Sequence, residues 1–259
     1  MQSNPSGFFW YELLTRDAAG AKAFYGAVVG WETEDLGGPH SGYSLLKTDG
    51  IGVAGLMGLS GEGCEAGGEP GWVGYVEVSN ADSAAASIEA GGGRVLRAPD
   101  DIPEVGRFAA VADPQGAKFM ILAPLPRDDV PPPKPRMTPG HTGWHELYAE
   151  DGDAIFPFYA EQFGWTEDSV LNMGPMGNYR LFRTSGDEAV GGIMTRQPHI
   201  PRPVWNFYFV VDGIDAAAAR IGEHGGTVTM GPMPVPDGSF IVMATDPEGV
   251  SFALVSTTK

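Results

Sequence analysis

The sequence predicts an α+β fold made of four βαβββ units, because it contains an internal duplication and a strand–helix–strand pattern in every quarter. The stretch WYELLTRDAAGAKAFYGAVVGW, from Trp10 to Trp31, returns as WHELYAEDGDAIFPFYAEQFGW, from Trp144 to Trp165. Three further pairs of similar segments follow in the same order: Gly42–Met57 and Asn178–Met194, Trp72–Val95 and Trp205–Val228, Gly106–Leu122 and Gly238–Leu254. The chain is therefore a tandem duplication.

The first quarter begins with an alternating strand, Phe8 to Thr15, which is followed by an amphipathic helix. Asp17 or Thr15 can cap this helix. Gly30 is expected to end it, because glycine readily adopts the left-handed conformation found just after a helix. Short strands are expected at residues 43–47 and 53–57.

The second quarter repeats this plan. A strand is expected at residues 73–78, a helix at 81–90 that three glycines stop, and further strands near Arg94, at 108–112 and at 118–122. The segments DPQG and DPEG are predicted turns, because Asp and Pro start a turn and Gly ends it. The third and fourth quarters follow the same pattern through the repeat.

A proline-rich connector separates the two halves. Seven of the 18 residues from Ala123 to Gly140 are proline, which favours an extended, polyproline-like segment with no core of its own. We therefore expect a first domain at residues 1–123, a linker at 124–140 and a second domain at 141–259.

The bulk composition limits the partners and the compartment. A net charge of −17 would repel a phosphate backbone, so a nucleic acid is not an expected partner. No apolar run of about 18 residues is present and the first residues lack the basic region of a signal peptide, so no membrane association is expected. The single cysteine, Cys64, cannot form an internal disulfide, which predicts a passive loop thiol in a cytoplasmic protein.

The strand–Asp–helix–FY…GW segments, the glycine-rich hairpins and the closing DPxG strands resemble the vicinal oxygen chelate superfamily. This superfamily includes glyoxalase I, bleomycin-resistance proteins, fosfomycin-resistance enzymes and extradiol dioxygenases. The resemblance covers both halves and is closest to duplicated glyoxalase-like proteins named as hydroxylases or lyases. It implies that βαβββ units pair into an open, cupped sheet around a ligand cavity, so the chain would form two tandem glyoxalase-like half-barrel domains.

Each repeat keeps a glutamate, Glu12 or Glu146, in the middle of its first and otherwise apolar strand. Because successive side chains in a strand point to opposite faces, Trp10, Glu12 and Leu14 share one face. A carboxylate is least costly where water or a ligand can reach it, so we expect both glutamates on the concave faces. They are candidate general bases whose pKa an aromatic pocket would raise, and a structural role as hydrogen-bond acceptors is the alternative.

Active members of this superfamily bind a divalent metal through His and Glu, and the metal acts as a Lewis acid on an oxygenated substrate. When the ligand positions are transferred to this sequence, they fall on Trp10, Val73 and Met120 in the first half and on Trp144, Asn206 and Ala253 in the second. Such side chains cannot hold a hard divalent cation, and Asn206 alone would be a poor ligand, so no metal or other cofactor is predicted. A site across the halves, made of Glu12, Glu146 and a loop histidine, stays open as the alternative.

The other candidate residues are aromatic or polar side chains expected on the concave faces, where they would bind a small molecule. They are Trp10, Tyr75, Glu77 and Met120 in the first half, and Trp144, Tyr148, Asn206 and Tyr208 in the second. Alternatively, these aromatic side chains fill two small cores and enclose nothing.

Two functions are consistent with these residues. The first is a glyoxalase-like lyase, isomerase or oxygenase that acts on a small oxygenated or aromatic metabolite, with Glu12 and Glu146 as catalytic residues. The second is a non-catalytic protein that sequesters a small aromatic or cationic compound, such as a drug or toxin. Paired cups would also allow two chains to associate as a homodimer.

Overall fold

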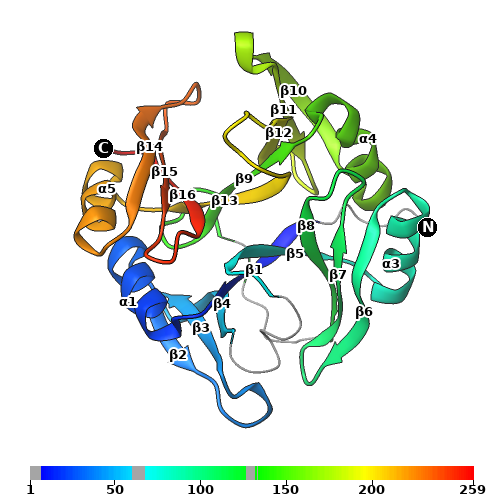
Figure 1. Ribbon diagram of the computed structural model, residues 1–259, viewed down its shortest axis with the longest axis horizontal. Coiled ribbons are helices and arrows are strands. Elements are labelled where there is room, and N and C mark those ends of the chain that lie inside the picture. Colours follow the sequence, from blue (N-terminus) through cyan, green and yellow to red (C-terminus); the bar gives the residue numbers. More distant parts are fainter. Residues whose placement is uncertain (1–6, 60–67, 127–131, 133) are drawn as a thin grey trace. The chain divides into compact units, whose positions relative to one another are not determined.

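The computed structural model describes residues 7–59, 68–126, 132 and 134–259, and Cys64 and part of the linker lie outside these ranges. In the described residues each half contributes eight strands and two α-helices (Figure 1). The first half contains β1 (Phe8–Thr15), α1 (Ala18–Val29), β2 (Glu32–Asp35), η1 (Gly38–His40), β3 (Tyr43–Thr48), β4 (Ile51–Gly58), β5 (Gly71–Glu77), α3 (Ala81–Ala90), β6 (Arg94–Ile102), β7 (Gly106–Ala112) and β8 (Lys118–Pro124). The second half contains β9 (Thr142–Ala149), α4 (Gly152–Phe163), β10 (Thr166–Asn172), η2 (Gly174–Met176), β11 (Asn178–Arg183), β12 (Gly191–Thr195), β13 (Val204–Val210), α5 (Ile214–Glu223), β14 (Thr227–Pro234), β15 (Phe240–Thr245) and β16 (Ser251–Ser256).

The order of the elements confirms the predicted α+β fold with a strand, a helix and three strands in each quarter. Local signals set the helix limits. The Asp17 carboxylate accepts a hydrogen bond from the Gly20 N–H at 2.9 Å, and the helix ends at Gly30, whose φ of 92° is left-handed. In the repeat, Asp151 caps α4 and Gly164, with a φ of 71°, ends it.

The two sheets have the same topology. Their strand orders are β2-β3-β4-β1-β5-β8-β7-β6 and β10-β11-β12-β9-β13-β16-β15-β14. The edge strand β2 was not predicted, because its sequence, ETED, is exposed throughout and has no apolar alternation. In the parallel pairs β1–β4 and β9–β12, the two repeated glutamates stand opposite glycines: Glu12 opposite Gly55 and Glu146 opposite Gly192.

The chain packs as two compact units that mix the halves. The unit that we call 1/4 contains the first and fourth quarters, and unit 2/3 contains the second and third. Unit 1/4 comprises Trp10–Val73, Pro133–Trp144 and Asn206–Lys259, and unit 2/3 comprises Met1–Phe9, Gly74–Pro132 and His145–Trp205. Each sheet is made of strands from one half of the sequence, whereas each compact unit contains one quarter from each half. The domain limits 1–123 and 141–259 therefore stay a prediction.

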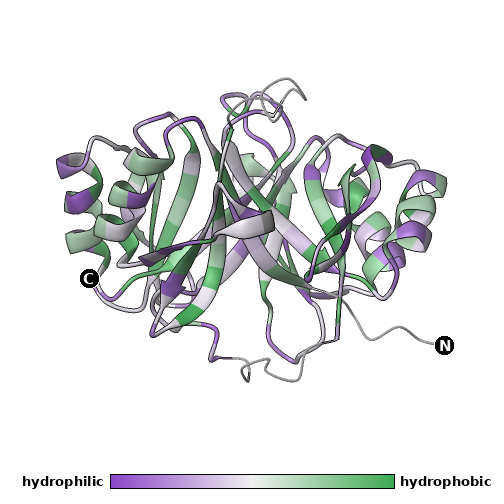
Figure 2. Cartoon of the chain, turned by 90° about the horizontal axis from the view of Figure 1, so that it is seen from below, coloured by the Kyte–Doolittle hydropathy of each residue, from purple (hydrophilic) through white to green (hydrophobic). Residues whose placement is uncertain are grey.

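Helix pairs and aromatic clusters form the core of each unit. In unit 1/4, α1 packs against α5, and in unit 2/3, α3 packs against α4 (Figure 1). Trp165 of unit 2/3 stacks on Phe182, with ring centroids 4.4 Å apart, and on Tyr159 at 5.0 Å. Figure 2 shows long apolar stretches along the strands and a mixture of apolar and hydrophilic residues along the helices.

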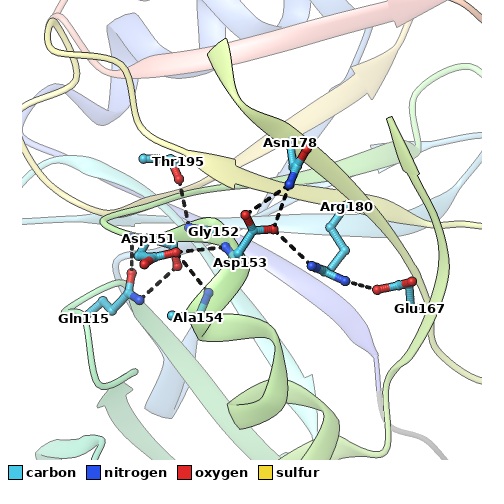
Figure 3. Close-up of polar contacts among 9 residues, drawn as sticks. All are labelled: Gln115, Asp151, Gly152, Asp153, Ala154, Glu167, Asn178, Arg180 and Thr195. Atoms are coloured by element: carbon cyan, nitrogen blue, oxygen red, sulfur yellow. Dashed lines mark hydrogen bonds and ion pairs between the residues drawn. The ribbon is translucent and has the colours of Figure 1, made fainter. Parts of the chain in front are cut away.

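In unit 2/3 the DPQG turn joins the second quarter to the third. The Tyr159 hydroxyl donates to the buried Asp113 carboxylate at 2.9 Å, and the Trp205 indole N–H donates to the Tyr159 oxygen at 3.0 Å. The Gln115 side chain exchanges two hydrogen bonds with the backbone of Asp151, at 2.8 and 3.0 Å (Figure 3). The turn therefore attaches to the start of α4.

In unit 1/4 the DPEG turn makes the corresponding connection. The Tyr25 hydroxyl donates to the Asp246 carboxylate at 3.2 Å and accepts from the Trp72 indole at 2.9 Å. The Glu248 carboxylate accepts from the backbone N–H of Arg16 at 3.2 Å. Burial raises the pKa of Asp246. The repeated FY and DPxG motifs thus form buried Trp–Tyr–Asp chains between quarters.

The end of the linker is an ordered turn, which corrects the expectation of an extended connector. The Thr138 N–H donates to the Pro135 carbonyl and the His141 N–H donates to the Thr138 carbonyl, both at 3.1 Å. Val210, at the end of β13, exchanges backbone hydrogen bonds of 2.8 Å with Gly140 and His141. Residues 135–141 therefore belong to unit 1/4, because their backbone groups find partners there.

Candidate functional site

The first repeated glutamate belongs to a buried hydrogen-bonded cluster in unit 1/4. The Trp10 indole N–H donates to the Tyr43 hydroxyl at 3.0 Å, and that hydroxyl donates to the Glu12 carboxylate. Glu12 is only 6% exposed. Burial, and then the charge of Glu12, raise the pKa of Tyr43 above its usual range, so the phenol stays protonated. Glu12 is therefore a hydrogen-bond acceptor in this cluster, and the Tyr43 hydroxyl supplies one of its donors.

A glycine makes room for this tyrosine in each half. A Cβ added to Gly55 would collide with the Tyr43 hydroxyl, and a Cβ added to Gly192 would collide with the Tyr179 ring. Glu146, the register partner of Gly192, is 7% exposed. Both glutamates are therefore far more buried than the sequence suggested.

Sequence reasoning missed Tyr43 and Tyr179. They occupy the same place in the paired segments GYSLL and NYRLF, so the repeat of a tyrosine at this place could have identified them.

A second set of residues lies around Asn206 in unit 1/4. Tyr208 follows Asn206 by two residues in β13 and thus shares its face of the sheet. Tyr208 stands opposite Ala253 in the register and, with Val210, Ala253 and Val255, forms a buried cluster that we call the Tyr208 cluster. Half-buried residues pack against this cluster: Met137, Trp144, Ile241 and Met243. We call Asn206, the Tyr208 cluster and these four side chains the Asn206 site.

The Asn206 amide is the unusual group of this site. The side chain is 6% exposed, and its Nδ2 atom has no hydrogen-bond partner among the residues that the structure describes. Buried polar groups are nearly always paired, and leaving one unpaired costs about 1–3 kcal/mol. An oxygen acceptor from a bound molecule would satisfy this donor.

The first half lacks such a donor. Val73 occupies the position of Asn206 in the repeat, and Met120, which stands opposite Tyr75, occupies that of Ala253. Methionine and valine offer no strong donor, and the longer methionine fills more space than alanine. The halves thus share a sheet topology but differ in residue type at these two positions.

The structure divides the predicted site residues between the units. Unit 1/4 holds Trp10, Glu12, Trp144, Asn206 and Tyr208, and unit 2/3 holds Tyr75, Glu77, Met120, Glu146 and Tyr148. Within unit 2/3, Tyr75 stands opposite Met120 and Tyr148 stands opposite Met194. Glu77 is exposed.

The residues do not fit the divalent metal that the superfamily implies. Within the described part of the chain, no group of three or more His, Cys, Asp or Glu residues is placed to hold a metal ion. The transferred ligand positions in the second half carry Trp144, Asn206 and Ala253, which offer one amide and no imidazole or carboxylate.

The histidine beside Glu146 is structural. The His145 Nδ1–H donates to the Val190 carbonyl at 2.7 Å, and the ring stacks on Phe8 with centroids 5.2 Å apart. Burial lowers the pKa of His145 to about 4, so it is neutral at pH 7. The adjoining cavity of about 60 Å³ is far below the roughly 300–1,000 Å³ of typical small-molecule pockets.

Both halves of the chain match one known family. The family model of the Glyoxalase/Bleomycin resistance protein/Dioxygenase superfamily matches residues 7–121 and again 138–254. The chain therefore belongs to this superfamily, as the resemblance in the sequence predicted. No described helix is long and apolar enough to cross a membrane.

Several relatives are similar over nearly their whole length. CFP32 of Mycobacterium tuberculosis, provisionally named a glyoxylase, is 31% identical over 95% of this chain and 93% of its own. The anthracycline biosynthesis protein DauV of Streptomyces sp. is 28% identical over 97% of this chain and 93% of its own.

Solved structures support the fold. The Mn(II)-bound glyoxalase from Novosphingobium aromaticivorans has a TM-score of 0.68 and 18% identity, covering 99% of this chain and 84% of that one. The 2,2',3-trihydroxybiphenyl 1,2-dioxygenase from Sphingomonas wittichii has a TM-score of 0.69 and 13% identity, covering 98% and 91%.

Proposed function

We propose that this protein binds a small, planar, oxygenated aromatic molecule at the Asn206 site. The Asn206 amide donates a hydrogen bond to a carbonyl or hydroxyl oxygen of the ligand. Trp144 and Tyr208 contact its ring, because aromatic side chains offer large apolar surfaces with preferred stacking geometries.

The unpaired amide carries this proposal. A buried donor without a partner lowers the stability of the unliganded protein, and a bound oxygen would remove that cost. The first half has valine at this position and the same fold, so the fold does not require a polar group there. A role in ligand binding would explain why a polar side chain stands at this position.

The relatives support the class of ligand. DauV of Streptomyces sp. and DnrV of Streptomyces peucetius are both named as anthracycline biosynthesis proteins. The dioxygenase from Sphingomonas wittichii is named for a trihydroxylated biphenyl. These names refer to aromatic molecules that carry several oxygens.

The test is a titration with 1,4-dihydroxyanthraquinone, followed by its visible absorbance and by quenching of tryptophan fluorescence. The wild-type protein should bind it saturably. Asn206→Val should raise the dissociation constant about tenfold, because one hydrogen bond of about 1.4 kcal/mol is lost. The reciprocal change in the first half, Val73→Asn, should leave the dissociation constant unchanged. Absence of saturable binding, or equal affinity of the wild type and Asn206→Val, would refute the proposal.

Catalysis on the same class of ligand is a second candidate function. Glu12 is the candidate base, because this buried carboxylate belongs to the same unit as the Asn206 site. Incubation with the probe and mass analysis of the products would separate the two functions. A product that the wild type forms and Glu12→Gln does not would support catalysis. Tight binding without any product would support sequestration.

A further inference from the structure

Two rows of side chains connect the Asn206 site to the edge of its sheet. Residues that stand opposite each other in paired strands point to the same face. The first row crosses four neighbouring strands, β13, β16, β15 and β14, through register partners: Tyr208, Ala253, Met243 and Met230. The second row crosses the same strands beside it: Val210, Val255, Ile241 and Met233. The face that carries the Tyr208 cluster thus continues, with no charged side chain in either row, to the edge strand β14 (Figure 1).

The outer ends of the two rows are exposed. Met230 is 44% exposed and Met233 is 40% exposed, whereas the inner ends, in the Tyr208 cluster, are buried. Single exposed apolar residues are common, but a contiguous exposed patch marks an interaction site. Methionine is flexible and polarisable, so it can adapt its shape to a bound molecule. The two methionines therefore offer an apolar surface that is continuous with the Asn206 site.

The equivalent rows in the first half end in an ion pair. They run through Tyr75, Met120, Ala110 and Arg97, and through Glu77, Leu122, Phe108 and Asp100. The Arg97 guanidinium binds the Asp100 carboxylate at 2.8 Å. In the repeat these two charged residues occupy the positions of Met230 and Met233. Charged side chains commonly protect an edge strand from unwanted pairing. The fold thus accepts a charged pair here, and the second half has two exposed methionines instead.

We infer that the ligand of the Asn206 site extends to the edge of the sheet and that its far end is uncharged and apolar. Neighbouring strands lie about 4.8 Å apart, so the three spacings from β13 to β14 cover about 14 Å. A single aromatic ring is much shorter than this. The substrate class is then an oxygenated aromatic that carries further fused rings or an alkyl chain.

This inference rests on the proposed function, because it adds a second contact region for the same ligand. The continuity of the rows with the Tyr208 cluster favours that ligand as the occupant of the methionine surface. A second copy of the chain would bring its own net charge of −17 to this face, and the two copies would repel each other.

The experiment compares two probes with the same oxygenated ring. They are 1,4-dihydroxyanthraquinone and 6-hexyl-1,4-dihydroxyanthraquinone, which carries an alkyl chain on the ring far from the hydroxyls. The wild type should bind the hexyl probe about tenfold more tightly, because its methylene groups leave water for the methionine surface. The double variant Met230→Gln, Met233→Gln should reduce this ratio to about threefold or less, since glutamine keeps the length of methionine but is polar.

Met176→Gln is the matched control. Met176 is also an exposed methionine, at 42%, but it belongs to unit 2/3. This variant should keep the full ratio.

Equal affinity of the wild type for both probes would overturn the inference and leave the proposed function standing. A ratio that the double variant keeps, or that Met176→Gln reduces equally, would also overturn it. If the double variant keeps the ratio but converts a dimer to a monomer in analytical ultracentrifugation, the methionines contact a second copy and the inference is overturned. Failure of both probes to bind would overturn the proposed function as well.

Discussion

Replacing Asn206 with valine should make the unliganded protein more stable while it weakens ligand binding. The perturbation removes a buried amide whose Nδ2 atom has no partner in the described structure. Valine stands at the equivalent position, Val73, in the first half, and β-branched side chains are favoured in strands. The substitution therefore exchanges an unsatisfied polar group for an apolar one that this fold already accepts.

The expected gain follows from the cost of the unpaired donor. That cost is about 1–3 kcal/mol, and we expect a net gain of about 1–2 kcal/mol after small packing losses. In a chain of this size each kcal/mol raises the melting temperature by roughly 2–4 °C. The gain should disappear in the presence of a saturating ligand, because only the wild-type amide then gains a partner.

Urea unfolding followed by circular dichroism and tryptophan fluorescence measures the free energy of unfolding. The reciprocal variant, Val73→Asn, should change the free energy of unfolding by less than Asn206→Val does, because Val73 is only half-buried and water can reach an amide there. A free energy of unfolding for Asn206→Val at or below that of the wild type would show that the amide carries no penalty. The reasoning behind the proposed site would then be refuted.

Three further predictions concern the buried framework. The folded-state pKa of His145, about 4, lies below its unfolded value of 6.5. The unfolded chain therefore binds the proton first, and the free energy of unfolding should fall by about 3 kcal/mol as the pH drops from 6.5 to 4. Urea unfolding at a series of pH values should show a flatter pH profile for His145→Gln than for the wild type, and identical profiles would contradict this prediction. Tyr159→Phe removes the 2.9 Å hydrogen bond to Asp113 and should lower the free energy of unfolding by about 1.5–3 kcal/mol. Burial already raises the pKa of Asp113, and loss of this hydrogen bond would raise that pKa further. The loss of stability should therefore be larger at neutral pH than in acid, and equal losses at both pH values would speak against a charged acceptor. Gly192→Ala should destabilise the protein by about 1–3 kcal/mol, because the added Cβ collides with a tyrosine ring. Gly222→Ala is the control: its Cβ meets nothing within 4 Å, so this change in α5 should be neutral or stabilising. Equal effects of the two variants in thermal unfolding would argue against the collision.

Most of the fold was readable from local patterns. The strand at Phe8–Thr15 and the helix at Ala81–Ala90 occur where alternation, caps and glycines predicted them. The strand β2 was missed, because a short, fully exposed strand has no apolar alternation to reveal it. The turn at the end of the linker was missed because its hydrogen-bond partner, Val210, lies far away in the sequence.

The candidate site was predictable in part. Asn206 was named because a ligand position of the superfamily falls on it, and Tyr208 because it was expected on a concave face. The structure shows both on the same face of one strand. The sequence did not reveal that Arg136 lies over the Trp144 ring. Glu12 was expected to be accessible, but it is buried and accepts a hydrogen bond from Tyr43.

The sequence by itself determined the duplication, the order of strands and helices, and the caps and turns, because each depends on residues close together in the chain. Only the tertiary structure decided which quarters meet. Tyr25 of the first quarter bonds to Asp246 of the fourth, and no local signal encodes that pairing. The tertiary structure likewise decided that the Nδ2 atom of Asn206 has no partner among the described residues, because the pairing of a buried polar group depends on atoms from distant segments.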